Sequence, residues 1–141
     1  MSITLKDIRK SFGADPAVAG VSLDIAPGEF FVVLGPSGCG KSTLLRLIAG
    51  LEALDAGEVS IAGRRVAGPG LNLAPEDRRV GVVFQSYALW PHMSVAENVA
   101  FPIRTEGVDR ATRDRRTEAC LATVELLPFA DRKPAELSGG Q

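Results

Sequence analysis

Gly35-Pro36-Ser37-Gly38-Cys39-Gly40-Lys41-Ser42-Thr43 is the stretch that decides the fold of this chain. The apolar residues 30–34 precede it, and leucines at helical spacing follow it from position 44 onward. The order is therefore strand, glycine-rich turn and helix, with the pattern G-x-x-x-x-G-K-S at the turn. This pattern in this context predicts a loop that binds the phosphates of a nucleotide.

The residue types of this loop suit an anion. Glycines let the backbone take positive φ and approach a ligand closely, and successive N–H groups then form an anion-binding nest at the start of a helix. The Lys41 ammonium can reach the β- and γ-phosphates, and the Ser42 hydroxyl suits Mg²⁺. The predicted phosphate-binding residues are Gly35, Ser37, Gly38, Cys39, Gly40, Lys41, Ser42 and Thr43. The alternative is a glycine turn that binds nothing.

Composition narrows the class of protein. The 141 residues are enough for one domain with a real core, and 45% apolar with 23% charged residues is ordinary for a globular protein. A formal net charge of −1 does not indicate the strongly basic surface that nucleic-acid-binding proteins usually have. The longest apolar run, residues 30–34, is far short of the roughly 20 residues that span a bilayer. The first residues lack the pattern of a signal peptide, so residence in the cytosol is expected.

Periodicity predicts a mixed first part and a helical second part. Strands are expected at residues 3–8, 18–25, 29–34, 57–61 and 80–84, with 29–34 and 80–84 buried. A helix is expected from Lys41 to Leu51, and residues 67–77 are expected to form a loop. Further helices are capped by Ser94 and by Asp109. The second runs to about Leu127, with an apolar side of Ala119, Val124 and Leu127 and Leu121 at its edge.

A second motif lies at the end of the sequence, Leu137-Ser138-Gly139-Gly140-Gln141. Together with the upstream loop, it makes the chain resemble the ATP-binding subunits of ABC transporters, whose signature is LSGGQ. The resemblance covers all 141 residues. It implies an α/β fold: a P-loop NTPase core with an antiparallel β subdomain and a helical subdomain, truncated. Residues 1–87 would form the nucleotide-binding β core and residues 88–141 the helical subdomain that ends in the signature.

The resemblance also implies roles for particular residues. Phe12 lies where such subunits place an aromatic ring that stacks on adenine. Gln85 matches the family's Q-loop glutamine, which touches Mg²⁺ or the attacking water, so Gln85 and Lys41 are the expected catalytic residues and Ser42 and Gln85 the expected metal ligands. Ser138, Gly139 and Gly140 of one subunit would meet the ATP bound by another. The cofactors implied are ATP and Mg²⁺.

Residues 84–99 look most like importer subunits for polyamines, ferric iron, sulfate or sugars. The function implied is ATP binding and, in the full-length protein, ATP hydrolysis that powers solute import. The partners implied are transmembrane permease subunits and a second ATP-binding subunit, as a homodimer or a pair, with no nucleic acid. The location implied is the cytoplasmic face of the membrane, in bacteria the inner membrane.

Several interpretations stay open. Phe12 stacks on a base or packs in a core. The cluster Tyr87, Leu89, Trp90 and Met93 either packs between the two parts of the chain or forms a groove for a helix of a membrane partner. His92, the only histidine, is interpreted as a loop or groove residue. The arginines at 104, 110, 113, 115 and 116 interleave with acidic residues, which favours a solvated helix face over a phosphate-binding patch.

The family also has an apolar strand ending in Asp-Glu after the signature, and no such strand occurs in these 141 residues. We therefore expect an N-terminal fragment that by itself does not hydrolyse ATP at a useful rate, and whose sheet edges invite aggregation. Two other functions remain: a soluble ABC-type ATPase acting on nucleic acid or ribosomes, and a nucleotide-binding module without catalysis.

Overall fold

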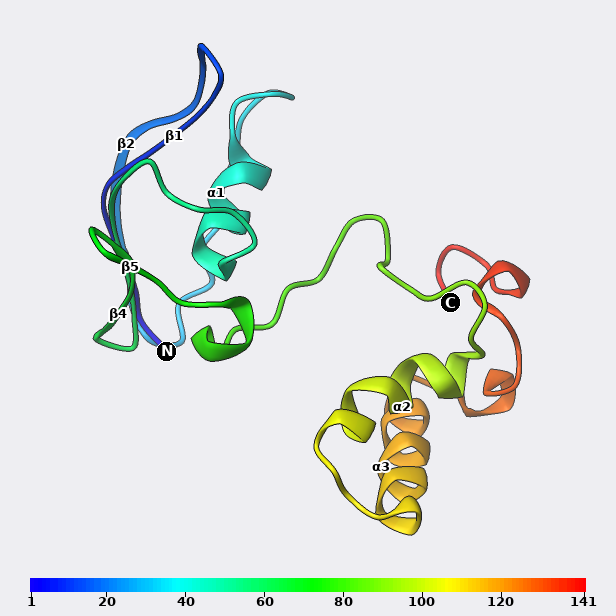
Figure 1. The fold of residues 1–141 in the computed structure, drawn as a ribbon. Helices are drawn as coiled ribbons and strands as arrows, with labels where there is room; N and C mark the ends of the chain where they lie inside the picture. The colour runs from blue at the N-terminus through cyan, green and yellow to red at the C-terminus, as the bar shows by residue number, and fades with distance from the viewer. The chain divides into compact units, whose positions relative to one another are not determined.

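The computed structural model describes all 141 residues, and the chain divides into two compact units, Met1–Val82 and Val83–Gln141 (Figure 1). The first unit contains a sheet and one α-helix. The second is helical. None of the helices in the structure has the length and apolarity needed to cross a membrane.

The sheet of the first unit is antiparallel throughout, in the order β2-β1-β3-β4-β5. Its strands are β1 (Ile3–Phe12), β2 (Asp15–Ile25), β3 (Ala56–Ile61), β4 (Arg64–Gly68) and β5 (Leu71–Asn72). The strands predicted at residues 3–8, 18–25 and 57–61 each lie within an observed strand. Strands β4 and β5 were not predicted, because they are short and fall largely in the Gly- and Pro-rich stretch that suggests a loop.

Helix α1 (Lys41–Ala49) packs its apolar side on this sheet. Leu44 and Leu47 are buried there together with Leu5, Ile8 and Val59. The helix ends before Leu51, contrary to prediction, because Gly50 takes a left-handed φ of 82° and its N–H closes the last turn on the carbonyls of Arg46 and Leu47. Leu51 is 44% exposed as a result. A 3₁₀ turn, η1 (Pro75–Arg78), follows the sheet.

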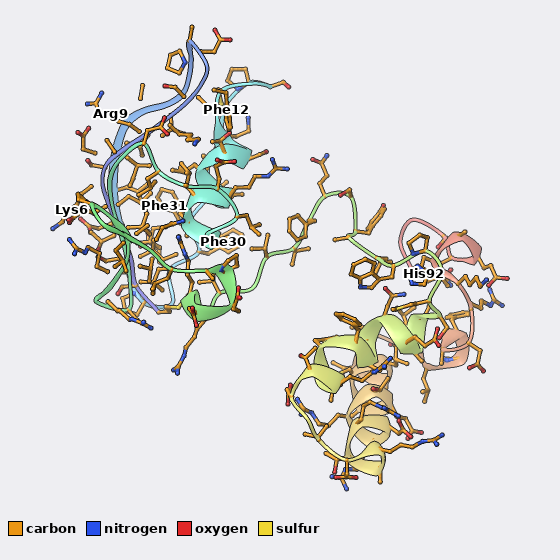
Figure 2. All side chains as sticks on the ribbon, in the orientation of Figure 1. Lys6, Arg9, Phe12, Phe30, Phe31 and His92 are labelled. Atoms are coloured by element: carbon orange, nitrogen blue, oxygen red, sulfur yellow. The ribbon has the colours of Figure 1, made fainter.

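The apolar runs at residues 29–34 and 80–84 form no strand, although the sequence predicts a buried strand at each. The side chains of Phe30, Leu34 and Val83 are 92%, 86% and 99% exposed; Figure 2 labels Phe30 and its neighbour Phe31. A strand needs a partner that satisfies its N–H and C=O groups, and neither run pairs with the five-stranded sheet. An apolar run becomes a buried strand only when another strand is available to pair with it, and these two runs have none.

The second unit is built on α2 (Val95–Thr105) and α3 (Arg110–Thr123), which pack against each other. Ser94 caps α2 in a complete capping box with Glu97, and the Asp109 carboxylate accepts the Thr112 N–H at the start of α3. The 3₁₀ turns η2 (Leu127–Phe129) and η3 (Pro134–Glu136) follow.

The predicted apolar side of α3 is wrong in detail. The helix ends at Thr123, short of Leu127, and its buried positions are Thr117 and Leu121. Ala119 is exposed, and Val124, beyond the last helical residue, is 60% exposed. The sequence predicts Leu121 at the edge of the apolar face, yet Leu121 is 1% exposed and is one of the two buried residues of the helix. The charged residues of this helix left too few apolar positions to fix the phase of the periodicity.

Candidate nucleotide-binding site

The loop before α1 has the backbone of an anion-binding turn. Gly38 and Gly40 have φ of 83° and 90°, values that residues with a side chain rarely adopt. Gly40 is the N-cap of α1, and its carbonyl accepts the Leu44 N–H at 2.8 Å. No side chain caps this end of the helix, so its first N–H groups are left for a ligand.

Space as well as conformation requires glycine in the loop. A Cβ at Gly40 would overlap the carbonyl oxygen of Ala17 in β2, and a Cβ at Gly35 would lie 2.6 Å from the Cys39 sulfur. The loop therefore packs tightly against β2 at Gly40, and within the loop the Cys39 side chain packs against Gly35.

The Lys41 ammonium lies inside this turn. Its Nζ donates to the carbonyl oxygens of Gly35 at 2.7 Å and Pro36 at 2.6 Å, and it lies 3.4 Å from Cys39 Sγ. No carboxylate in the chain pairs with Lys41, since none of the ion pairs includes it. The loop therefore holds a full positive charge with neutral acceptors only. Ser42 is exposed in the first turn of α1, and Thr43 is half-buried beside it.

Phe12 lies at the end of β1, next to the turn into β2, and is 51% exposed (Figure 2). It is therefore not a core residue. Its strand partner is Asp15 of β2, and Ala17, two positions further along β2, is the residue against which Gly40 packs. Phe12 and the glycine-rich turn therefore both neighbour the first residues of β2.

Ion pairs stabilise the end of the β1–β2 hairpin near Phe12. Lys10 Nζ is 5.4 Å from the centre of the Phe12 ring and pairs with Glu52 at 3.1 Å and Asp55 at 3.2 Å. The Asp55 carboxylate also accepts the Ser11 N–H at 2.6 Å. This backbone hydrogen bond, with the charge of Lys10, lowers the pKa of Asp55, while the pairing with Glu52 raises the pKa of Lys10.

A cavity of about 490 Å³ lies behind the loop in the first unit. Most of the side chains that line this cavity are apolar, including Val21, Leu23 and residues 31–34. Lys41 and Cys39 also line it. Such walls do not suit a triphosphate. The cavity is instead the space between β2 and the apolar run that fails to join the sheet.

The other predicted site residues belong to the second unit. Gln85 is exposed in a turn where Tyr87 and Ala88 have φ of 62° and 52°, which is strained for residues with a Cβ. Ser138, Gly139 and Gly140 are exposed too, in a turn that closes when the Ser138 N–H donates to Gln141 Oε1 and the Gln141 N–H donates to the Ser138 carbonyl, both at 3.0 Å.

Within the aromatic cluster, Tyr87, Leu89 and Trp90 are 69%, 47% and 48% exposed. The Trp90 ring contacts Phe101 of α2, with 5.8 Å between ring centres, and His92 at 6.2 Å. Asn98 holds this segment through its side-chain amide, a role that sequence reasoning missed. An asparagine in the second turn of a helix gives no sign of which backbone it will bind.

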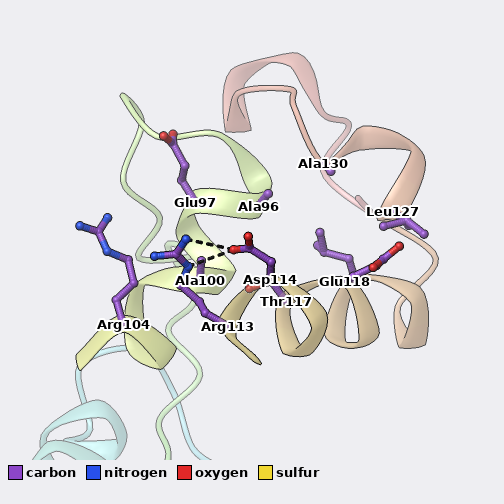
Figure 3. A pocket seen from close by; sticks show the side chains of 11 residues that line it. Ala96, Glu97, Ala100, Arg104, Arg113, Asp114, Thr117, Glu118, Leu127 and Ala130 are labelled. Carbon is purple, nitrogen blue, oxygen red and sulfur yellow. Dashed lines mark hydrogen bonds and ion pairs between the residues drawn. The ribbon is translucent and has the colours of Figure 1, made fainter. Parts of the chain in front are cut away.

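A second cavity, of about 390 Å³, lies between α2 and α3 (Figure 3). Arg113 and Asp114 pair with each other at its rim at 3.0 Å. The Thr117 hydroxyl has no hydrogen-bond partner but is also sealed from solvent, so it offers nothing to a ligand without a rearrangement. Of the five arginines considered as a phosphate-binding patch, Arg110, Arg113 and Arg116 are paired with carboxylates.

Comparison with known proteins defines the class. The profile of the family described as ABC transporter matches residues 18–141, and the chain belongs to this family. Among solved structures, a dimeric structure of MJ0796, a bacterial ABC transporter cassette, superimposes with a TM-score of 0.83 at 35% identity, over 99% of this chain and 64% of that one. A post-hydrolysis state of MJ0796 bound to ADP and Pi superimposes with a TM-score of 0.82. The predicted α/β fold of a P-loop NTPase is thereby confirmed.

The curated relatives are import ATP-binding proteins. The chain is 52% identical over 139 residues to sn-glycerol-3-phosphate import ATP-binding protein UgpC 1 of Rhizobium johnstonii, and 51% identical over 141 residues to UgpC of Burkholderia thailandensis. It spans 37% and 38% of the length of these two relatives. The predicted resemblance to importer-type ATP-binding subunits is confirmed.

Proposed function

We propose that the complete protein binds ATP at the loop of residues 35–43 and hydrolyses it to power solute import through membrane permease subunits. The observation that carries this proposal is the Lys41 ammonium, which is held at a helix N-terminus by two neutral carbonyls and no carboxylate. The oxygens of a triphosphate are stronger acceptors than carbonyls, because hydrogen bonds between charged partners are about twice as strong as neutral ones.

The base is proposed to stack on Phe12, whose exposed ring neighbours the first residues of β2, as the loop does. The remaining loop residues, Gly35, Ser37, Gly38, Cys39 and Gly40, would contribute backbone N–H groups, and Thr43 would contact the α-phosphate. We propose residues 1–87 and 88–141 as the two parts of this nucleotide-binding domain.

The residues of the loop suit a Mg²⁺ ion that is bound by few protein ligands. The chain has no group of three or more Asp, Glu, His or Cys that could form a metal cage. Mg²⁺ commonly binds with one or two protein ligands, substrate phosphates and water, and the exposed Ser42 hydroxyl beside Lys41 suits that mode. Ser42 and Gln85 are proposed as its protein ligands, where it would neutralise charge on the phosphates. Gln85 would also orient the attacking water.

A second copy or a related subunit is proposed to complete the site. Ser138, Gly139 and Gly140 lie in an exposed turn, where the Ser138 hydroxyl and the N–H groups of the two glycines suit a γ-phosphate for the same reason as the loop does. The MJ0796 cassette, which this chain resembles, is described as dimeric. Closure of the pair on ATP and opening after hydrolysis would shift a membrane partner between two conformations.

The exposed side chains of Tyr87, Leu89 and Trp90 are proposed to receive the permease, while the contact of Trp90 with Phe101 shows that part of the cluster also packs within its own unit. This would place the protein peripherally on the cytoplasmic face of the membrane. The names of the relatives make sn-glycerol-3-phosphate the first solute to test.

The proposal is tested by Lys41→Ala in the complete protein. Mg·ATP binding, measured by isothermal titration calorimetry, should be lost or weakened by more than tenfold, because the only cation of the loop is removed. Lys6→Ala, an exposed lysine of β1 without an ion pair, is the matched control and should bind as the parent does. Equal affinity of the Lys41→Ala variant and the parent would overturn the proposal.

A further inference from the structure

Arg78 is the one charged side chain buried in this chain, with 2% of its surface exposed. It lies at the end of η1, and every hydrogen bond it makes is to a neutral acceptor. Burial lowers the pKa of its guanidinium, which nevertheless stays protonated because arginine begins so high. A buried charge without a counter-ion is costly to keep for stability alone, since an apolar side chain could fill the same volume.

Its principal partners are at the C-terminal end of α1. Arg78 Nη1 donates to the carbonyl oxygens of Leu47 at 2.7 Å and Ile48 at 3.0 Å. The N–H groups of Gly50 and Leu51 satisfy the carbonyls of Arg46 and Leu47, so Ile48 depends on the arginine. A cation at this end also opposes the negative pole of the helix.

The other nitrogens of Arg78 are fixed to the segment between the sheet and η1. Nε donates to the Leu73 carbonyl at 2.9 Å, and Nη2 donates to Asn72 Oδ1 at 2.7 Å. A Cβ at Gly50 would lie 2.5 Å from Arg78 Nε, so the guanidinium lies directly against the backbone there. The side chain is thus a rigid bridge between α1 and the β5–η1 segment.

We propose that Arg78 is a positioning residue for the nucleotide site, an inference that rests on the proposed function. Lys41 and Ser42 lie in the first turn of the same nine-residue helix whose last turn Arg78 holds. No side chain caps the N-terminal end of α1, whereas Arg78 binds two backbone carbonyls in its last turn. Because a short helix moves as a rod, a tilt at one end displaces the phosphate-binding groups at the other.

The test compares Arg78→Met with the parent in the complete protein, well below the melting temperature of each. ATP binding should weaken by about tenfold, a smaller factor than the roughly hundredfold loss of rate that a misplacement of about 1 Å can cause at a reacting centre. AMP binding should change less, because AMP keeps the proposed contact of its base with Phe12 on β1 and lacks the β- and γ-phosphates that Lys41 of α1 would hold. This difference between ATP and AMP is not expected from a general loss of stability.

Two controls separate positioning from stability. Arg65→Met removes an arginine of an exposed ion pair with Glu58, and should leave ATP binding unchanged. Val66→Ala removes buried atoms from the same core without removing a hydrogen bond to α1, and should lower the melting temperature but not the ATP affinity. Parent-like ATP affinity in Arg78→Met, or an equal loss in Val66→Ala, would overturn the proposal.

If Arg78→Met does not fold, Arg78→Lys takes its place. Lysine keeps the charge but cannot bridge α1 and the β5–η1 segment with a planar fork, so ATP affinity should fall by a smaller factor. Unchanged affinity with a lowered melting temperature would show a purely structural role. The failure of this inference can be told apart from the failure of the proposed function. If only the role of Arg78 is wrong, Lys41→Ala still abolishes ATP binding; if the proposed function is wrong, it does not.

Discussion

Asn98 holds both backbone polar groups of Trp90: its Oδ1 accepts the Trp90 N–H at 2.8 Å, and its Nδ2 donates to the Trp90 carbonyl at 3.1 Å. The same Nδ2 donates to the Ser94 carbonyl at 2.9 Å, at the N-cap of α2. The exposed aromatic cluster is therefore attached to the start of a helix by one side chain.

Asn98→Ala should loosen this attachment. Trp90 is the only tryptophan, so its fluorescence reports on this segment alone. We expect lower anisotropy and emission shifted to the red, because the ring loses its fixed position against Phe101. Asn72→Ala, the matched asparagine in the first unit, should leave both signals unchanged. Unaltered anisotropy in Asn98→Ala would show that ring packing alone fixes the tryptophan.

Phe12→Ala should weaken ATP binding by about tenfold or more, since stacking of a base on an aromatic ring is worth about 1–3 kcal/mol. Phe12→Tyr keeps the ring face and should bind as the parent does. Because the side chain is half exposed, the alanine variant should fold normally, which circular dichroism checks. Tight ATP binding by the alanine variant would remove the ring from the site.

Gly40→Ala should destabilise the first unit by about 2 kcal/mol or more and abolish ATP binding, because the new Cβ meets the Ala17 carbonyl and the backbone has φ of 90°. Gly81→Ala is the matched control: no atom lies within 4 Å of its Cβ and its φ is not positive, so the change should be small. Denaturant titration measures both. A similar effect from the two substitutions would contradict the packing of the loop against β2.

The contribution of Asp55 to stability should depend on pH. Its pKa is lowered from the ordinary 3.8, first by the Ser11 N–H and then by Lys10. A carboxylate with a depressed pKa stabilises the fold above its unfolded-state value, and this stability is lost as pH falls through the folded-state value. Asp55→Asn should therefore lower the melting temperature at pH 7, and this effect should shrink as the pH falls below 3.8 and through the depressed folded-state pKa. The exposed Asp24→Asn serves as control, and a constant difference across this range would contradict the assignment.

Local patterns predicted the local structure well. The glycine-rich motif gave α1 and its loop, and Ser94 and Asp109 were identified as caps from residue type alone. What failed depended on distant partners. Residues 29–34 and 80–84 have the composition of buried strands, but composition does not say which strand lies beside them. Arg78 was missed because its α1 partners are about thirty residues away in sequence and are backbone carbonyls, which every residue has.

The inward fold of the Lys41 side chain sets a threshold for ligands. Two of the three N–H donors of its ammonium bind the carbonyls of Gly35 and Pro36, so a ligand that takes over these donors must be a stronger acceptor than the two carbonyls. A halide or an uncharged nucleoside is not, whereas a dense array of anionic oxygens is. In the proposed function, selectivity for polyphosphate over smaller anions would therefore begin with the two carbonyls that already bind Lys41.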